Sequence, residues 1–459
     1  MADELELSPI GPESAGTAAN PPPLEIKHSS KSTVKGAIAN FVNSIIGAGI
    51  VGLPYALHEA GLGAGLLLLL AIAGMTVYSA QLIIQLGVAA GKLDFEALCE
   101  HAFGPAGFVC ITVSMFLFAA GAMISYLVIL ADTAAAVFAH WAGYQQSIMT
   151  RRAVLSVVAL SCLLPLCLIR DMSKLARTSA LSIVAIVWIV FFVTLRSLGP
   201  ATGAVLPAGD LTHIAVISQD VFPAIGVFAF AFVCQHNSFI VFNSLSDSST
   251  SAWARTARYS VLIATIACAV LALFGFLQFR GLTQGNLLNN YAWDDELANF
   301  TRLTYSITMV LTYPQEMFVA RHCVFAFVRR RSSRLTAVSA EDDTISLMNL
   351  DDGALVPVST CAHVAVSLVL FFCSLTIALL TQDLGFILEI TGSVSATILG
   401  FIMPAALFFK LTDTKLAFWR HPSSAWTGLR EAAAGIVLGA FGIVAFLCST
   451  GLTLVKAFR

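Results

Sequence analysis

The composition of this chain is that of a membrane protein. Hydrophobic residues make up 58% of its 459 residues, charged residues only 11%, and the mean hydropathy is +0.84, whereas a soluble chain carries about 25% charged residues. The formal net charge of −2 gives no general attraction for nucleic acid. We therefore expect most of the chain to lie in a lipid bilayer, with no nucleic-acid partner and no separate soluble domain.

Residues 1–32 differ from the rest in being polar and rich in Pro, Ser, Glu and Gly. Such a composition predicts a disordered tail, which we assign to the cytoplasm. The tail contains no apolar core typical of a cleaved signal peptide. The first membrane segment is therefore expected to direct insertion.

The remainder, 33–457, is predicted to be an all-α integral membrane domain. A window of about 20 apolar residues identifies a membrane span. Eleven such windows occur, at 34–58, 61–87, 107–138, 153–169, 176–196, 219–246, 256–279, 302–327, 359–380, 384–410 and 431–456. Between the second and third, Asp94–Gly104 has helical spacing and polar ends, which predicts a helix at the membrane surface.

The first span is interrupted where a spanning helix should be uniform. Its central part, Ala39–Ala56, contains Asn43, Gly47, Gly49 and Pro54. Unwound backbone survives in lipid only where it faces protein or a water-filled cavity, and glycine allows a ligand to approach the backbone. The segment therefore predicts a helix break that binds a ligand, with close helix packing through small residues as the alternative.

A second interrupted span, Val221–Leu245, is predicted to break around Cys234–Asn237. Paired breaks in two halves are typical of the substrate site of secondary transporters. Half-helix ends carry partial charges of both signs, which suit the carboxylate and ammonium of a zwitterion. We infer an inverted repeat of about 34–196 and about 219–410, followed by an accessory helix at 431–456.

Polar side chains inside the spans are further candidates for the site. Asn43 lies one turn before the first break, and Thr308 and Thr312 share one face of the eighth span. Their oxygens suit a sodium ion, although hydrogen bonds within the bundle explain them equally well.

Ionisable residues inside membrane spans are functional hypotheses by default. Four occur here: Asp132, His236, Glu316 and Glu389. His236 lies in the second break, where either titration or a structural hydrogen bond accounts for it. Glu316 is close to Arg321 and is predicted to be an ion-paired residue at a helix end. Glu389 is a candidate for lining the permeation path, with packing against polar groups of the bundle as the alternative.

The distribution of charge predicts the orientation in the membrane. With a cytoplasmic N-terminus, 18 of the 25 Lys and Arg residues lie in cytoplasmic segments, as the positive-inside rule requires. One of these segments, 329–356, is predicted to be a disordered loop with possible phosphorylation at Ser332 or Ser333. Asn299 begins the chain's N-x-S/T match, close to the eighth span. No disulfide is expected, because the ten cysteines lie in or beside the predicted spans.

Six segments in order resemble the amino acid/auxin permease family, and within it the sodium-coupled neutral amino acid transporters, with vacuolar fungal and plant relatives sharing much of the pattern. They are Asn43–Ala56, Gly121–Asp132, Arg170–Ser182, Phe230–Leu245, Gly281–Asp295 and Leu311–Arg321. The resemblance implies a LeuT-like fold of eleven transmembrane helices, with a 5+5 inverted repeat, broken helices 1 and 6 and one accessory helix.

The resemblance also implies site residues. By this likeness Asn43 and Thr312 correspond to sodium ligands, to which the spacing adds Thr308. The residues implied to face the substrate are Asn43, Gly47, Ala48, Gly49, Ser125, Tyr126, Phe230 and His236.

We therefore predict a secondary active transporter of neutral amino acids, coupled to sodium or protons, without a cofactor, in the plasma membrane or a vacuolar or lysosomal membrane. An amino-acid sensor that does not transport is the main alternative, and a channel the next, although no filter-like loop or ring of acidic residues is found. An enzyme is not expected, because no catalytic motif stands out.

Overall fold

The computed structural model describes residues 32–143, 147–169, 178–199, 217–218, 220–339, 359–413 and 425–457. Within these residues all regular structure is helical, and the isolated β-bridge joins Ser32 to Leu245. The predicted tail, apart from Ser32, lies outside the described residues. So does the part of the predicted loop 329–356 that follows Ser339, the residue at which a long helix ends.

The helices have the following bounds, in chain order. They are α1 Val34–Ile45, η1 Ala48–Gly52, α2 Leu53–Ala60, α3 Leu62–Ala90, α4 Phe95–Ala142, α5 Ile148–Val158, η2 Ala159–Leu163, α6 Leu164–Cys167, α7 Thr178–Leu198, α8 Val221–Phe232, α9 Gln235–Ser244, α10 Thr250–Phe279, η5 Arg280–Leu282, η6 Leu287–Asn290, α11 Glu296–Ser339, α12 Thr360–Leu380, α13 Leu384–Thr391, η7 Gly392–Ala396, η8 Ile398–Ile402, α14 Met403–Asp413, α15 Ala425–Val444, η10 Ala445–Ser449 and α16 Thr450–Ala457.

The number of helices suited to crossing a membrane is lower than predicted. In the described part of the chain nine qualify by length and hydropathy, or ten when the bent pair Val34–Ile45 and Ala48–Ala60 is taken as one span. The predicted span 302–327 lies within α11 but does not qualify. Polar residues between Thr304 and Glu316 lower its hydropathy. A count of eleven is therefore not confirmed.

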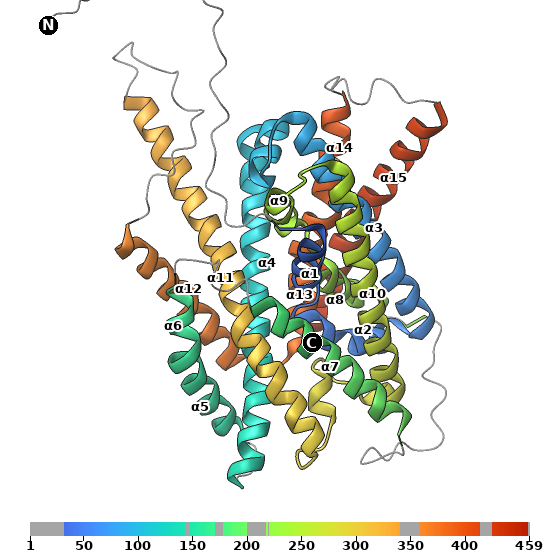
Figure 1. Ribbon diagram of the computed structural model, residues 1–459, viewed down its shortest axis with the longest axis vertical. Coiled ribbons are helices and arrows are strands. Elements are labelled where there is room, and N and C mark those ends of the chain that lie inside the picture. The colour runs from blue at the N-terminus through green and yellow to red at the C-terminus, as the bar shows by residue number, and fades with distance from the viewer. Residues whose placement is uncertain are drawn as a thin grey trace, which may run out of the picture.

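Burial separates central from peripheral helices. In the apolar window of Val221–Ser244, which contains the second predicted break, 89% of residues are buried, and in that of α4 the share is 72%. The corresponding shares are 22% for Ile148–Cys167 and 28% for Ala432–Ala457, whose exposed apolar side chains suit contact with lipid. Figure 1 accordingly shows α8 near the centre of the bundle and α15 at its edge.

The longest helices, α4 and α11, pack side by side and run antiparallel. His140 pairs with Glu296 (3.1 Å) near one end, and Glu100 pairs with Arg330 (2.6 Å) near the other. Between them the hydroxyls of Thr133 and Ser306 are 2.7 Å apart. These contacts fix which residues of the two helices lie at the same depth.

The predicted surface helix over Asp94–Gly104 exists as the first part of α4. Gly104 has φ 64° and ψ −149° and interrupts the helical backbone before Pro105. Glycine adopts such a positive φ without steric cost, and proline is accepted in the first turn of a helix. A short helix therefore precedes the membrane part of α4, as predicted.

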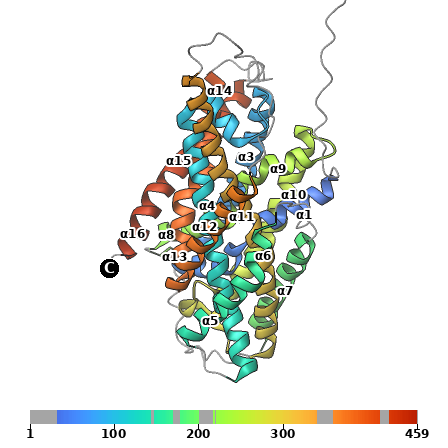
Figure 2. The ribbon, with the colours of Figure 1, turned by 90° about the vertical axis from the view of Figure 1, so that its left-hand side faces the viewer.

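The C-terminal helices close one edge of the bundle. Figure 2 shows α15 and α16 on the outside, and α16 packs against α8 and α13. Lys456 of α16 pairs with Glu59 of α2 (2.5 Å) and with Asp220, which precedes α8 (3.1 Å). The last span is thus attached to the two segments that contain the helix breaks.

Candidate functional site

The first predicted break is present, and it follows Ile45. Ile46 (φ −90°, ψ 81°) and Gly47 (φ −106°, ψ −137°) leave the helical conformation, and a 3-10 turn begins at Ala48. The two halves of the span are bent by 46°. The backbone at Gly47–Gly49 therefore lies outside a regular α-helix, as the sequence predicts.

Two tyrosines converge on this break. The hydroxyl of Tyr305 (α11) donates a hydrogen bond to the Gly47 carbonyl, at 3.2 Å. The hydroxyl of Tyr126 (α4) lies so near that a Cβ on Gly47 would be 2.8 Å from it. A side chain at position 47 would therefore have to displace the Tyr126 hydroxyl. Tyr126 was predicted from the resemblance, whereas Tyr305 was missed, because a tyrosine nine residues after a helix start has no distinctive sequence signal.

The second break lies at Val233–Cys234, slightly before the predicted centre. Val233 is extended (φ −68°, ψ 125°), and α9 begins at Gln235. The Gln235 side chain accepts a hydrogen bond from the Cys234 N–H (3.0 Å) and donates one to the Ser79 hydroxyl of α3 (2.8 Å). Gln235 therefore satisfies the interrupted backbone and leaves His236 in the first turn of α9.

The two breaks touch each other. A Cβ on Gly49 would come within 2.7 Å of the Ala231 Cα. Asn237 donates to the Ser44 hydroxyl at 2.7 Å and lies 2.9 Å from the His236 Nε2. Two segments almost 200 positions apart in the sequence are thus joined by backbone proximity and a polar side-chain bridge.

An aromatic group covers one side of the second break. The ring of Phe118 (α4) lies 5.3 Å from that of Phe230 and 4.9 Å from the imidazole of His236. All three side chains are buried. The structure therefore brings the predicted residues Phe230 and His236 together. Phe118 completes this apolar surface and was not among the predicted site residues.

Three buried polar atoms near this region lack a hydrogen-bond partner among the described residues. They are Oδ1 of Asn43, Nδ1 of His236 and Oε2 of Glu316. Buried polar atoms are almost always paired, and in a membrane an unpaired one costs several kcal/mol. Such atoms are therefore candidates for contacts with a substrate, an ion or a proton.

The predicted hydroxyl ligands are buried, but each donates to its own helix. Ser125 bonds to the Gly121 carbonyl (2.9 Å), Thr308 to that of Thr304 (3.1 Å) and Thr312 to that of Thr308 (2.9 Å). A hydroxyl oxygen that donates its proton still has lone pairs for a cation. The geometry is therefore compatible with the sodium site without requiring it.

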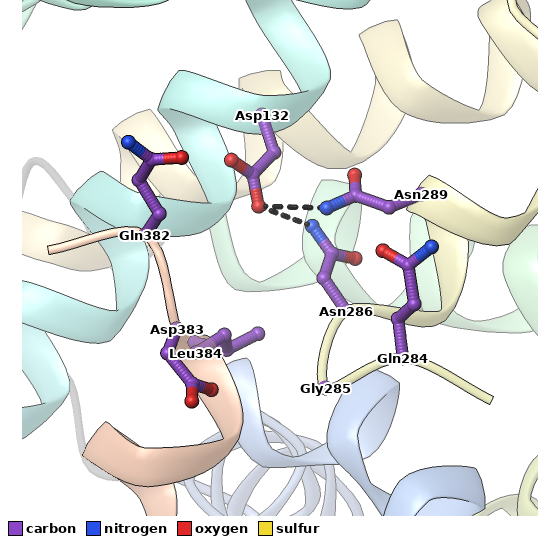
Figure 3. A pocket seen from close by; sticks show the side chains of 8 residues that line it. All are labelled: Asp132, Gln284, Gly285, Asn286, Asn289, Gln382, Asp383 and Leu384. Atoms are coloured by element: carbon purple, nitrogen blue, oxygen red, sulfur yellow. Dashed lines mark hydrogen bonds between the residues drawn. The ribbon is translucent and has the colours of Figure 1, made fainter. Parts of the chain in front are cut away.

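Of the predicted intramembrane carboxylates, Asp132 is fully engaged. It pairs with Arg151 of α5 (2.7 Å), and its second oxygen accepts hydrogen bonds from Asn286 (3.2 Å) and Asn289 (3.1 Å). Figure 3 shows Asp132 with Asn286 and Asn289. They lie at a cavity of about 350 Å³ between α4, the segment before α11 and the start of α13. The cavity is lined by Asp132, Gln284, Gly285, Asn286, Asn289, Gln382, Asp383 and Leu384.

The other two predicted carboxylates, Glu389 and Glu316, have surroundings that differ from the predicted ones: Glu389 has hydrogen-bond partners in the bundle, and Glu316 lacks the predicted ion pair. Glu389 accepts hydrogen bonds from Tyr55 (3.2 Å) and Thr453 (3.4 Å), so the structure favours packing against polar groups over a place in the permeation path. Glu316 was predicted to be ion-paired near Arg321, but within the described residues it forms no ion pair. Arg321 instead donates to the Cys167 carbonyl (3.2 Å) and the Ser367 hydroxyl (2.9 Å), because it points to α6 and α12.

Comparison with protein families gives a match over nearly the whole membrane domain. Residues 30–448 match the model of the family described as transmembrane amino acid transporter protein. A putative sodium-coupled neutral amino acid transporter 11 of Rattus norvegicus is 34% identical over 391 residues, 84% of this chain and 80% of the relative. Vacuolar amino acid transporter 2 of Saccharomyces cerevisiae is 29% identical over 404 residues, 86% of this chain and 80% of the relative.

A solved structure has a similar fold despite little sequence similarity. The manganese transporter of Eremococcus coleocola matches with a TM-score of 0.50 and 10% identity, over 93% of this chain and 95% of the other. At this identity the likeness concerns the fold alone. The shared fold extends over nearly the whole of both chains.

Proposed function

Because this chain belongs to the family of transmembrane amino acid transporter proteins, we propose that it is a secondary active transporter of neutral amino acids, coupled to sodium or a proton and working by alternating access. The contact between the two helix breaks carries the proposal. It places Gly49 of the first break against Ala231, in the last turn of α8 just before the second break. Polar atoms of Asn43 and His236 that have no hydrogen-bond partner among the described residues belong to the same two segments. No enzymatic activity is involved.

The half-helix ends account for binding of a zwitterion. The N–H groups at the start of η1 and α9 suit a carboxylate, and the carbonyls at the end of α1 and α8 suit an ammonium group. The rings of Phe118 and Phe230 offer an apolar surface to the substrate side chain. An uncharged side chain gains from this surface, whereas a charged one would lose its hydration there. A neutral amino acid is therefore the proposed substrate.

Coupling to one cation supplies sufficient energy. Moving one positive charge through 100 mV yields about 2.3 kcal/mol, which corresponds to about 50-fold accumulation of the substrate. Asn43, Thr308 and Thr312 are the proposed sodium ligands. In their favour are the unpaired Oδ1 of Asn43 and the available lone pairs of both threonine hydroxyls.

The proposed arrangement in the membrane follows from charge and from the breaks. The excess of Lys and Arg in alternate connecting segments supports a cytoplasmic N-terminus. Breaks in the first and sixth predicted spans support a LeuT-like 5+5 repeat, about 34–196 and about 219–410. The proposed location is the plasma membrane or a vacuolar or lysosomal membrane, and the name of the Saccharomyces cerevisiae relative favours a vacuolar one.

Uptake of a labelled neutral amino acid into proteoliposomes tests the function. We expect counterflow, the exchange of external labelled substrate for internal unlabelled substrate. In alternating access the binding site can return to the outer side with internal substrate bound, and this speeds the entry of the next labelled molecule. A sensor would bind the amino acid without uptake, and a channel would show no stimulation by internal substrate. Either result would exclude the proposed transport cycle.

The sodium site has a separate test. Asn43→Ala and Thr312→Ala are expected to weaken sodium-dependent uptake, because each removes an oxygen ligand. Thr376→Ala is the matched control: Thr376 also donates to its own helix, at 2.8 Å, but is exposed on α12. Unchanged sodium dependence in both site variants would exclude the ligand assignment while leaving transport itself intact.

A further inference from the structure

Glu316 is a carboxyl group inside a predicted membrane span, and none of the residues that the structure describes provides it with a counter-ion. It is only 9% exposed, and its Oε2 has no hydrogen-bond partner among the described residues. Burying a charged carboxylate without a partner is far more costly than burying the neutral acid. In the conformation seen here the side chain is therefore expected to hold a proton or another cation.

Apart from His101 of α4, which is exposed, the charged groups on helices packed against α11 have other partners within the described residues. On α4, Glu96 contacts His322 of α11 itself, Glu100 pairs with Arg330, Asp132 with Arg151 of α5, and His140 with Glu296. On α7, Arg196 pairs with Asp295, and His363 of α12 lies 3.2 Å from Arg321. The nearest titratable groups of α6 and η2 are the cysteines Cys167 and Cys162. None of these contacts compensates Glu316.

Tyr126 connects Glu316 to the first helix break. Thr133 of α4 and Ser306 of α11 lie at one depth, and Tyr126 follows about 10 Å further along the antiparallel pair. Tyr126 belongs to α4, the helix that packs against α11, and its hydroxyl lies against Gly47. Glu316 is ten residues after Ser306 on α11, about 15 Å along the pair in the same direction, so it lies at a depth close to that of Tyr126 and the first break.

We propose that the coupled ion is a proton and that the Glu316 carboxyl group carries it. This rests on the proposed function and chooses between its two cations. When the site faces the outer side, a hydronium ion gives a proton to the carboxylate: an O–H bond of the hydronium breaks, one forms on Glu316, and a water molecule is left. The neutral side chain is then buried as the breaks close around the substrate. After opening inward, that O–H bond breaks and the proton passes to cytoplasmic water, restoring the carboxylate.

Glu316→Gln tests the proposal, because glutamine imitates the protonated acid but cannot release a proton. In proteoliposomes whose external solution is about 2 pH units more acidic than the interior, the symport of one proton with each substrate molecule permits the wild type to accumulate substrate inside by up to about 100-fold. We expect the variant to show no accumulation. Counterflow at equal pH should persist, because exchange requires no net proton movement.

A matched control uses Glu389→Gln, since Glu389 is also buried but accepts hydrogen bonds from Tyr55 and Thr453. This variant should still accumulate substrate under the pH gradient. Accumulation by Glu316→Gln equal to the wild type would overturn the proposal. So would accumulation that is driven by a sodium gradient at equal pH and lost in the variant, because Glu316 would then hold sodium.

A second variant covers loss of folding. Glu316→Asp keeps a titratable group and should retain pH-driven accumulation, with a shifted dependence on external pH. If both variants keep counterflow and neither changes pH-driven accumulation, Glu316 is not the proton carrier. Absence of counterflow in the wild type would instead contradict the proposed transport function, so the two failures are distinguishable.

Discussion

Replacing Gly49 with alanine is expected to separate the two helix breaks. The added Cβ would lie 2.7 Å from the Ala231 Cα and 2.8 Å from its Cβ. One of these atoms belongs to the backbone of a buried helix, so it cannot move aside as a flexible side chain does. The two broken segments must therefore shift apart.

The size of the effect follows from the cost of overpacking. Inserting a methyl group into a well-packed core costs about 1–3 kcal/mol, which lowers the population of the state with touching breaks by about 5- to 150-fold. If that state is required for transport, initial counterflow rates should fall within this range. Ala231→Gly in the same protein removes only the contact with Cβ, so it should restore the rate incompletely.

Initial counterflow rates of purified Gly49→Ala in proteoliposomes measure this effect, with the apparent unfolding temperature as a check on folding. Gly74→Ala is the control, because Gly74 is an exposed helical glycine whose added Cβ would meet nothing within 4 Å. Wild-type counterflow by Gly49→Ala would refute the requirement for close contact. An equal loss in Gly74→Ala would show that the effect is not specific to the breaks.

Two further contacts give quantitative expectations. The effects of Asn237→Ala and Ser44→Ala on the counterflow rate should not be additive, because each variant removes the same 2.7 Å hydrogen bond between the breaks. A double-mutant cycle should give a coupling free energy of about 0.5–3 kcal/mol. Strictly additive effects would contradict a functional role for this hydrogen bond. Asp132→Asn should destabilise the protein by about 3–5 kcal/mol, because it leaves Arg151 buried without its carboxylate. The apparent unfolding temperature should therefore fall, and Asp132→Asn combined with Arg151→Met should recover part of the loss; a single variant as stable as the wild type would rule out a structural role for the pair.

The positions of the breaks could be predicted because their causes are local. Gly47 and Gly49 interrupt an apolar run, and a stretch of polar residues follows Cys234 in the other half. In a bilayer, backbone that leaves the helix must find partners elsewhere, so such interruptions stand out against uniform spans. The details were less accurate: the second break is at Val233–Cys234, and the hydropathy of α11 falls below that of a span.

Partners of individual side chains were not predictable from local sequence. Proximity to Arg321 along the chain indicated an ion pair for Glu316, but a helix turns about 100° per residue, so Arg321 points towards α6 and α12. Tyr305, Gln235 and Phe118 likewise join the site through contacts with other helices. Their roles depend on which helices are neighbours, which a single apolar segment does not specify.

The amino-acid sequence by itself determined that this protein is helical, lies in a membrane and contains two interrupted spans, since hydropathy and helix-breaking residues act over a few turns of one segment. Only the tertiary structure decided that the breaks meet at Gly49 and Ala231, that Asn237 joins Ser44, and that Glu316 has no counter-ion in the part of the chain that the structure describes. These features arise from the packing of distant helices, where steric fit and the pairing of buried polar groups select one arrangement among many with the same pattern of spans.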